Sequence, residues 1–296
     1  MKRSPIFTTV CVLAIGLLTG TRLLPGRFPS LWPRQIAAKE ESVAPRAAAE
    51  AVHSSKAEKL LSDARDKLIA YRSIHATIVA RVSIGEQQFK LAGEYIQGRD
   101  LQLRLELNTR VGETTGSLLE VCDGNILWIR RSIGESDRTI RRDVRQILAK
   151  VQSSKAIPEN MLIGDLGIGG LPGLLAALEQ AFRYHDLGKE TYNDREFAVI
   201  EGSWRKEFLA KVSDEKERPA YVPDAVRIYF DRETLFPKRL LYLKQTDAGE
   251  FDRLVTIDLS NIRLNGTLRE DEFQFAPVDK VGARDDTQRF INRMID

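Results

Sequence analysis

The stretch LQLRLELNT, from Leu101 to Thr109, alternates apolar and polar side chains over its first seven residues. Leucine occupies every second position, and glutamine, arginine and glutamate stand between the leucines. Because successive side chains of a β-strand point to opposite faces of the sheet, this pattern predicts a strand with one apolar face. Sheets of this kind are normally antiparallel, with the polar face in contact with water. The stretch therefore predicts a half-buried antiparallel sheet.

Further strands are predicted on both sides of this stretch. Upstream, apolar residues recur at every second position in 78–84 and again in 89–95. Downstream, Asp123-Gly124 supplies the positive φ angles that a tight hairpin needs. The remaining predicted strands are 117–121, 125–131, 197–204, 225–231, 238–245 and 254–261, with a short edge segment at 273–277.

Three helices are predicted from apolar residues at helical spacing. The first begins at a capping box formed by Ser55 and Glu58. The second covers 140–151, and the third follows Pro172 and reaches Phe182. One helix, several strands, two helices and more strands predict a single α+β domain, whose antiparallel sheet curves strongly around an apolar face.

The N-terminus has the features of an export signal. Lys2 and Arg3 precede an uncharged run at 5–20, which is typical of a secretory segment, either cleaved or retained as a membrane anchor. Residues after it are rich in Pro, Ala, Glu and Arg and predict a flexible spacer. The expected organisation is therefore a signal peptide or signal anchor at 1–25, a flexible linker at 26–55 and a folded domain at 56–296.

Charge and rare residue types argue against several functions. The 45 Lys and Arg residues are interleaved with 42 Asp and Glu residues, and the formal charge of +3 gives no case for nucleic acid. The three histidines and two cysteines form no metal-binding motif, so we expect no metal and no cofactor. Cys122 has no histidine near it in sequence and is interpreted as a small buried hydrophobe. We therefore predict no catalytic residues and no enzymatic activity.

Two motifs allow two interpretations each. The stretch GDLGIGGLPG, 164–173, lacks the lysine of a phosphate-binding loop. It predicts either a flexible approach to a helix or a mobile lid over an apolar site. A row of basic side chains, the basic ridge, is predicted opposite the apolar stripe of the second helix. It is interpreted either as a solvated helix face or as a surface that contacts lipid headgroups or a protein partner. Its residues are Arg138, Arg141, Arg142 and Arg145.

Four segments, in their order along the chain, resemble the LolA-like family of bacterial envelope proteins, the lipoprotein carriers and their relatives. LLSDARDKLIAYRSIHATIVARV (60–82) is similar to the helix and first strand of that family, and VCDGNILWI (121–129) is similar to its hairpin. VRIYFDRETLFPKRLLYLKQ (226–245) and LVTIDLSNIRLNGTLREDEFQFAP (254–277) are similar to its later strands. The resemblance covers roughly residues 56 to 287. It implies a half-barrel whose concave face is covered by helices.

The resemblance also implies a function. The expected protein is non-enzymatic, lies on the periplasmic side of the cytoplasmic membrane, and buries lipid or lipoprotein acyl chains in a cavity for lipoprotein sorting or lipid handling. The alternative is an envelope-stress sensor or scaffold that binds a protein partner. Candidate residues, for each of which ordinary core packing is the alternative, are Leu103, Leu105, Leu107, Trp128, Ile228, Leu241 and Leu243 for the cavity lining, and Leu174, Leu175 and Phe182 for the lid.

Overall fold

The computed structural model describes residues 52–85, 87–154, 166–212, 219–276 and 282–295. The predicted signal segment and most of the predicted linker lie outside the described residues. The first described helix, α2, covers Val52–Ala70, so helical structure begins before the predicted linker ends. Ser55 lies inside the first turn, and the predicted capping box at Ser55 and Glu58 is therefore not at the helix start.

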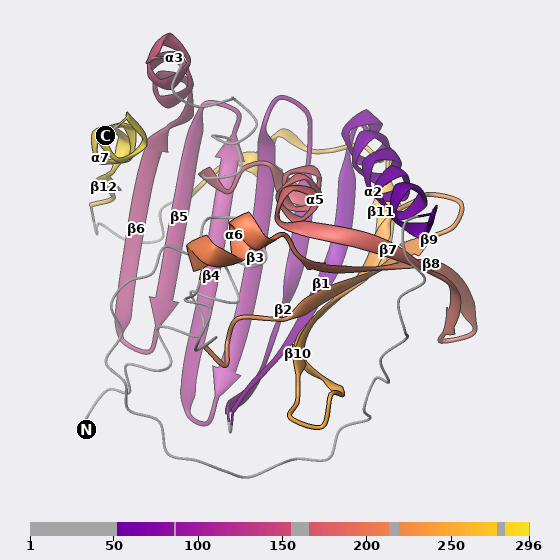
Figure 1. Ribbon diagram of the computed structural model, residues 1–296. Coiled ribbons are helices and arrows are strands. Elements are labelled where there is room, and N and C mark those ends of the chain that lie inside the picture. The colour runs from indigo at the N-terminus through magenta and orange to yellow at the C-terminus, as the bar shows by residue number, and fades with distance from the viewer. Residues whose placement is uncertain (1–51, 86, 155–165, 213–218, 277–281, 296) are drawn as a thin grey trace.

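Twelve strands form one open sheet in the order β12-β6-β5-β4-β3-β2-β1-β11-β10-β9-β8-β7 (Figure 1). Every neighbouring pair is antiparallel except β12 and β6, so the sheet is mixed at one edge. The strands are β1 Ile74–Ile84, β2 Gln87–Gln97, β3 Gln102–Val111, β4 Thr114–Asp123, β5 Ile126–Ile133, β6 Ser136–Asp143, β7 Phe182–Tyr192, β8 Arg195–Trp204, β9 Ala225–Asp231, β10 Pro237–Gln245, β11 Phe251–Leu264 and β12 Arg284–Asp285.

The sheet is built from two meanders that meet in its middle. Strands β1 to β6 follow one another as neighbours, and so do β7 to β11. The last strand of the second meander, β11, pairs with β1, which joins two parts of the chain that are far apart in sequence. The connection between the meanders carries α3 (Val144–Ser154) and α5 (Gly170–Ala181).

Helix α5 lies across one face of the sheet, and β7 and β8 turn out of the plane of β2 to β6 on that side (Figure 1). Helix α2 packs against both α5 and β7. The sheet is thus curved, with α5 on the inner side. The other helices are α6 Lys206–Val212, the single 3₁₀ turn η1 Glu270–Phe273, and α7 Thr287–Ile295, which packs against α3. None of the helices in the described ranges is both long and apolar enough for a membrane span.

The core lies between α5 and the face of the sheet that it covers, which we name the inner face. On β3 this face carries Leu103, Leu105 and Leu107, while Arg104 and Glu106 point to the outer face. A second, smaller apolar cluster lies on the outer face of β7 to β10. Its members are Leu187, Phe197, Val199, Ala225, Tyr229, Leu241 and Leu243.

The structure corrects the predicted elements in several places, and β12 and α6 are among the elements that were not predicted. Residues 138–143 belong to strand β6, because Gly134, with φ of +55°, turns the chain back to pair with β5. The helix predicted at 140–151 therefore begins only at Val144. Strand β7 and helix α7 were not predicted. The segment predicted as an edge strand at 273–277 is not a strand in its described part, because Phe273 ends η1 and Phe275 stacks on Trp128; residue 277 lies outside the described residues.

Candidate functional site

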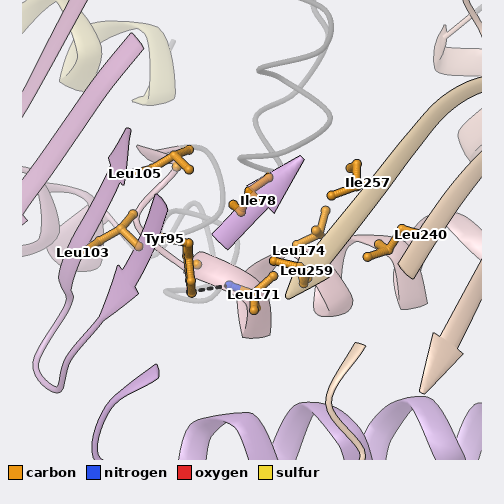
Figure 2. Close-up of a pocket in the computed structure, with 11 residues that line it drawn as sticks. Ile78, Tyr95, Leu103, Leu105, Leu171, Leu174, Leu240, Ile257 and Leu259 are labelled. Atoms are coloured by element: carbon orange, nitrogen blue, oxygen red, sulfur yellow. Dashed lines mark hydrogen bonds between the residues drawn. The ribbon is translucent and has the colours of Figure 1, made fainter. Parts of the chain in front are cut away.

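An apolar pocket lies between α5 and the inner face (Figure 2). Five strands of the sheet contribute to it, and Leu171 and Leu174 of α5 close it from the other side. The sheet residues that line it are Ile78, Tyr95, Leu103, Leu105, Leu240, Ile257 and Leu259, and Gly167 and Gly170 complete the lining at the start of α5.

The pocket is closed in this structure. Its volume is about 20 Å³, measured as the space open to the centre of a water molecule. A site needs roughly 10–15 Å³ on that measure to hold one water molecule. Among the described residues, this space is too small for an acyl chain, so the acyl-chain-sized cavity that the carrier hypothesis predicts is not seen there.

The N-terminal end of α5 is held by one buried phenol. The Tyr95 hydroxyl accepts a hydrogen bond of 2.8 Å from the backbone N–H of Leu171 and donates one to Gln97 Oε1. The N-cap residue, Gly169, makes no side-chain hydrogen bond to this helix end. Tyr95 therefore satisfies an N–H group that the helix itself leaves without a partner. Burial raises the pKa of Tyr95 above its ordinary value, so the hydroxyl stays protonated. Its hydroxyl is the only side-chain polar group among the lining residues.

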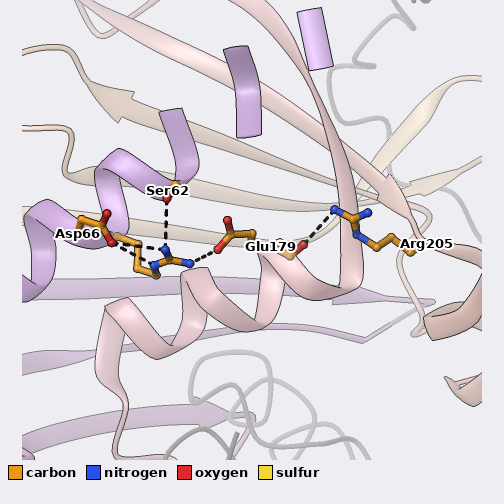
Figure 3. A network of polar contacts seen from close by, with 5 residues as sticks. Ser62, Asp66, Glu179 and Arg205 are labelled. Atoms are coloured by element: carbon orange, nitrogen blue, oxygen red, sulfur yellow. Dashed lines mark hydrogen bonds and ion pairs between the residues drawn. The ribbon is translucent and has the colours of Figure 1, made fainter. Parts of the chain in front are cut away.

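The C-terminal end of α5 is held by a polar network (Figure 3). Glu179 pairs with Arg65 of α2, and Arg65 also reaches Ser62 Oγ at 3.2 Å. Arg205 donates to the backbone oxygen of Glu179 at 3.5 Å and to Glu58 Oε1 at 3.4 Å. After α5 the chain continues directly into β7. This end of the helix is therefore fixed to α2 and to the sheet, whereas the other end depends on Tyr95 and on apolar contacts.

Two glycines of α5 differ in what surrounds them. Gly170 has a φ of +56°, and a Cβ atom there would collide with the Tyr95 hydroxyl and with Gln97 Oε1. Gly173, one turn later, has open space where a Cβ would lie. The close approach of the chain to Tyr95 therefore requires glycine at 170 and not at 173.

We expect Gly170→Ala and Gly173→Ala to change stability in opposite directions. The first should lower the free energy of unfolding by more than about 1 kcal/mol, because alanine is strained at positive φ and displaces the Tyr95 hydroxyl. The second should raise it by roughly 0.5–1 kcal/mol, because alanine favours a helix interior. Urea unfolding of both variants measures this. Equal effects at the two positions would contradict the described contact between α5 and Tyr95.

The structure places the predicted cavity residues in three groups. Leu103, Leu105 and Leu174 line the pocket. Leu107, Leu175, Phe182 and Ile228 are buried in the same core cluster without lining the pocket.

The third group lies on the wrong face of the sheet. Trp128 alternates with Leu127 and Ile129, which point inward, so its ring lies on the outer face against Phe275. Leu241 and Leu243 belong to the outer apolar cluster, because Leu240 and Tyr242 take the inward positions of β10.

The predicted basic ridge is not a helix face. Arg138, Arg141 and Arg142 lie on β6, and only Arg145 lies on α3. Arg141 pairs with Asp285, and Arg142 pairs with Asp286 at 3.1 Å. The Arg142 guanidinium also stacks over the Phe290 ring, 4.7 Å from its centre. These two arginines therefore fasten β12 and α7 to the edge of the sheet.

Eight of the eleven lining residues were not among the predicted candidates, and Tyr95 is one of them; Glu120, beside the pocket, was not predicted either. Tyr95 alternates in phase with Leu91 and Gly93, so its inward direction could have been found from the sequence, but its contact with Leu171 could not. Glu120 occupies an inward position of β4, directly opposite Leu105, and is only 4% exposed. Burial raises its pKa to about 7, against the opposing effect of Arg131 and Arg142.

Metal ligands and the one described cysteine were considered as possible reactive groups. In the described ranges, no group of three or more His, Cys, Asp or Glu side chains could hold a metal ion. Cys122 is fully buried, and burial raises its pKa to about 11. Since the thiolate is the nucleophile, this protonated thiol is inert at neutral pH.

No family model matches the sequence, and no curated protein matches it either. Solved structures do resemble it. An uncharacterized conserved protein from Thermus thermophilus shares 9% identity at a TM-score of 0.41, over 77% of this chain and 96% of that chain. The Pseudomonas aeruginosa MucA/MucB complex shares 13% identity at a TM-score of 0.37, over 75% of this chain and 61% of that chain.

A LolA superfamily protein from Nitrosomonas europaea matches at 12% identity and a TM-score of 0.28, over 76% of this chain and 99% of that chain. The family that the sequence resembles is thus among the structural neighbours. All three TM-scores lie below 0.5, so the fold is described from the topology and contacts of this chain and not from these neighbours.

Proposed function

We propose that this protein binds the acyl chain of a lipid or lipoprotein between α5 and the inner face of the sheet, and that it makes or breaks no bond. The observation that carries the proposal is the pocket beneath α5, which is lined by leucine and isoleucine side chains from four strands and one helix and by Tyr95 of a fifth strand. Ligand sites are typically apolar, with few polar groups that fix orientation. Tyr95 is such a group.

Binding is driven by the burial of apolar surface. Each methylene group that leaves water contributes about 0.8 kcal/mol, so a long acyl chain can replace the contacts that Leu171 and Leu174 make in the closed state. Without a ligand, the closed state is favoured because it keeps the apolar lining of the pocket away from water.

The contacts of α5 define how the pocket opens. Its C-terminal end is tied to α2 through Arg65 and Glu179, whereas among the described residues its N-terminal end is tied to the sheet by the hydrogen bond from Leu171 to Tyr95. Moving the N-terminal end therefore breaks fewer polar contacts. The glycines at 167 and 170 have positive φ values and connect this end to the chain before it. We propose that α5 swings about its C-terminal end when a ligand enters.

The proposed location is the periplasmic side of the cytoplasmic membrane. It rests on the basic N-terminus and the uncharged run at 5–20, and on the family resemblance. If 1–25 is retained as an anchor, the linker at 26–55 would let the domain at 56–296 deliver cargo only near that membrane.

A protein-binding sensor or scaffold is the second candidate, and one observation favours it. Strand β12 pairs only with Ile140 and Arg141 of β6. Within the described ranges, residues 136–139 therefore have no strand on their outer side. Such an edge can accept a strand from another protein.

The test is binding of a fluorescent fatty acid to the purified full-length chain in mild detergent. We expect saturable binding, and we expect Leu174→Trp to weaken it at least tenfold, because the larger ring fills the pocket. The control is Ile69→Trp, at a position 63% exposed on α2, which should bind as the unchanged protein does. Absence of saturable binding by the folded protein would shift the assignment to the partner-binding function.

A further inference from the structure

Glu120 is a buried carboxylate beside the pocket without a hydrogen bond. Its side chain is 5% exposed, and no described residue donates a hydrogen bond to it. The nearest cation is Arg131, whose Nη2 lies 4.0 Å from Glu120 Oε1, too far for a hydrogen bond. Buried polar groups are nearly always hydrogen-bonded, and the fully buried atom without a partner at this place is Arg131 Nε, so a ligand that binds both side chains supplies what the described residues do not.

Arg131 extends from Glu120 toward solvent. It lies on the inner face of β5, and its side chain is 40% exposed. Its Nε is nevertheless buried and has no hydrogen-bond acceptor. Arg138 lies directly opposite Arg131 on β6 and is exposed, so the outer end of this cluster carries two positive charges.

These groups lie in a fixed order along the sheet. Leu105 of β3 lines the pocket, and Glu120 of β4 stands directly opposite it. On β5, Ile129 is opposite Glu120, and Arg131 lies diagonally from it, opposite Leu118. Neighbouring strands are about 4.8 Å apart, so the path from β3 to β5 is about 10 Å long, and Arg131 Nη2 lies 4.0 Å from Glu120 Oε1.

We infer that Glu120 and Arg131 form a headgroup subsite for an anionic amphiphile that carries an N–H or O–H donor between its apolar chain and its anionic group. The inference rests on the proposed function, because the chain of this ligand occupies the pocket beneath α5. The donor binds the Glu120 carboxylate, and the phosphate or carboxylate beyond it binds Arg131, with Arg138 adding positive charge at the rim. This arrangement leaves neither buried group without a partner.

The order of the groups decides between ligand classes. A zwitterionic lipid, whose ammonium lies beyond its phosphate, would place its anion at Glu120 and its cation at Arg131. A plain fatty acid has no donor to offer between its chain and its carboxylate. N-acylated amino acids and lysophosphatidic acid both have the required order.

The test compares two ligands that differ by one donor, N-oleoylglycine and N-oleoylsarcosine, in which a methyl group replaces the amide hydrogen. Binding to the full-length chain is measured at pH 8, where Glu120 is charged. We expect N-oleoylglycine to bind about tenfold more tightly, the effect of one hydrogen bond to a charged group. In Glu120→Leu the two should bind within twofold of each other. Arg131→Gln should weaken both ligands by a similar factor.

The matched control is Glu106→Leu, which removes an outer-face carboxylate on the next strand and should keep the tenfold preference. A parallel pair, oleoyl-lysophosphatidic acid and its analogue without the free hydroxyl, distinguishes a lysophospholipid from an acylated amino acid as the better source. A preference that persists in Glu120→Leu overturns the inference and leaves pocket binding intact. If none of these amphiphiles binds, the inference and the proposed function both fail.

Discussion

Replacing Glu120 by glutamine is expected to raise the free energy of unfolding at pH 8, by at most about 3 kcal/mol. Burial raises the pKa of this carboxyl group from 4.5 to about 7 in the folded protein, although Arg131 and Arg142 face it. Each pH unit of this shift corresponds to about 1.4 kcal/mol. Glutamine has no charge to bury, so the variant avoids this cost.

The sign of the pH dependence follows from the same shift. Between about pH 4.5 and 7 the unfolded chain has released the Glu120 proton while the folded protein retains it. The folded state then binds more protons, so stability falls as the pH rises through this range and levels off above it. Glu120→Gln should lack this decline. Urea unfolding at several pH values measures both effects.

The control for this experiment is Glu106→Gln on the neighbouring strand. Glu106 is on the outer face, its side chain is 46% exposed, and it pairs with Arg104 at 3.1 Å. Exposed pairs of this kind contribute less than about 1 kcal/mol. If the two variants have the same stability and the same pH profile, Glu120 is not buried as described.

Arg227→Met is expected to destabilise the protein by roughly 3–5 kcal/mol, the largest effect that we predict. The Arg227 guanidinium is 5% exposed and donates to Glu201 Oε2 through Nε at 2.9 Å and through Nη2 at 2.6 Å. Glu201 is itself only 8% exposed. Removal of the arginine leaves this buried carboxylate without its two hydrogen bonds, and only His185 Nε2, 3.8 Å from Glu201 Oε1, remains beside it.

The double variant Glu201→Leu, Arg227→Met should recover most of that loss, because two apolar side chains can replace a buried ion pair without a net cost. The matched exposed pair is Arg232 and Glu196, where Arg232→Met should cost less than about 1 kcal/mol. A double variant that is as unstable as the single variant would contradict this account of the pair.

Alternation along the strands predicted much of the inner face. Leu103 and Leu105 line the pocket because the period of two is unbroken through β3. The prediction that Trp128 lines the cavity was wrong, because a shift of one residue moves a side chain to the opposite face and the hairpin alone does not define which face is inward. The prediction was also wrong for Leu241 and Leu243. Strand β10 is apolar on both faces, so the alternation that identifies an inner face is absent there.

The remaining errors concern information that is not local. The residues of β6 contain arginines and isoleucine at spacings compatible with a helix, and pairing with β5 decides the outcome. The contact of Tyr95 with Leu171 joins positions 76 residues apart. Glu120 has an ordinary local context, and only the burial of its strand makes it unusual.

The central claim, that an acyl chain binds beneath α5, is tested most directly by photolabelling. The full-length chain is irradiated with a fatty acid that carries a diazirine near its methyl end, and the labelled residues are identified by peptide mass spectrometry. The account predicts labels on pocket residues such as Ile78, Leu105 and Leu171, which unlabelled fatty acid competes away and Leu174→Trp abolishes. Labels confined to the outer-face cluster around Leu241, or labels that competition does not reduce, would contradict it.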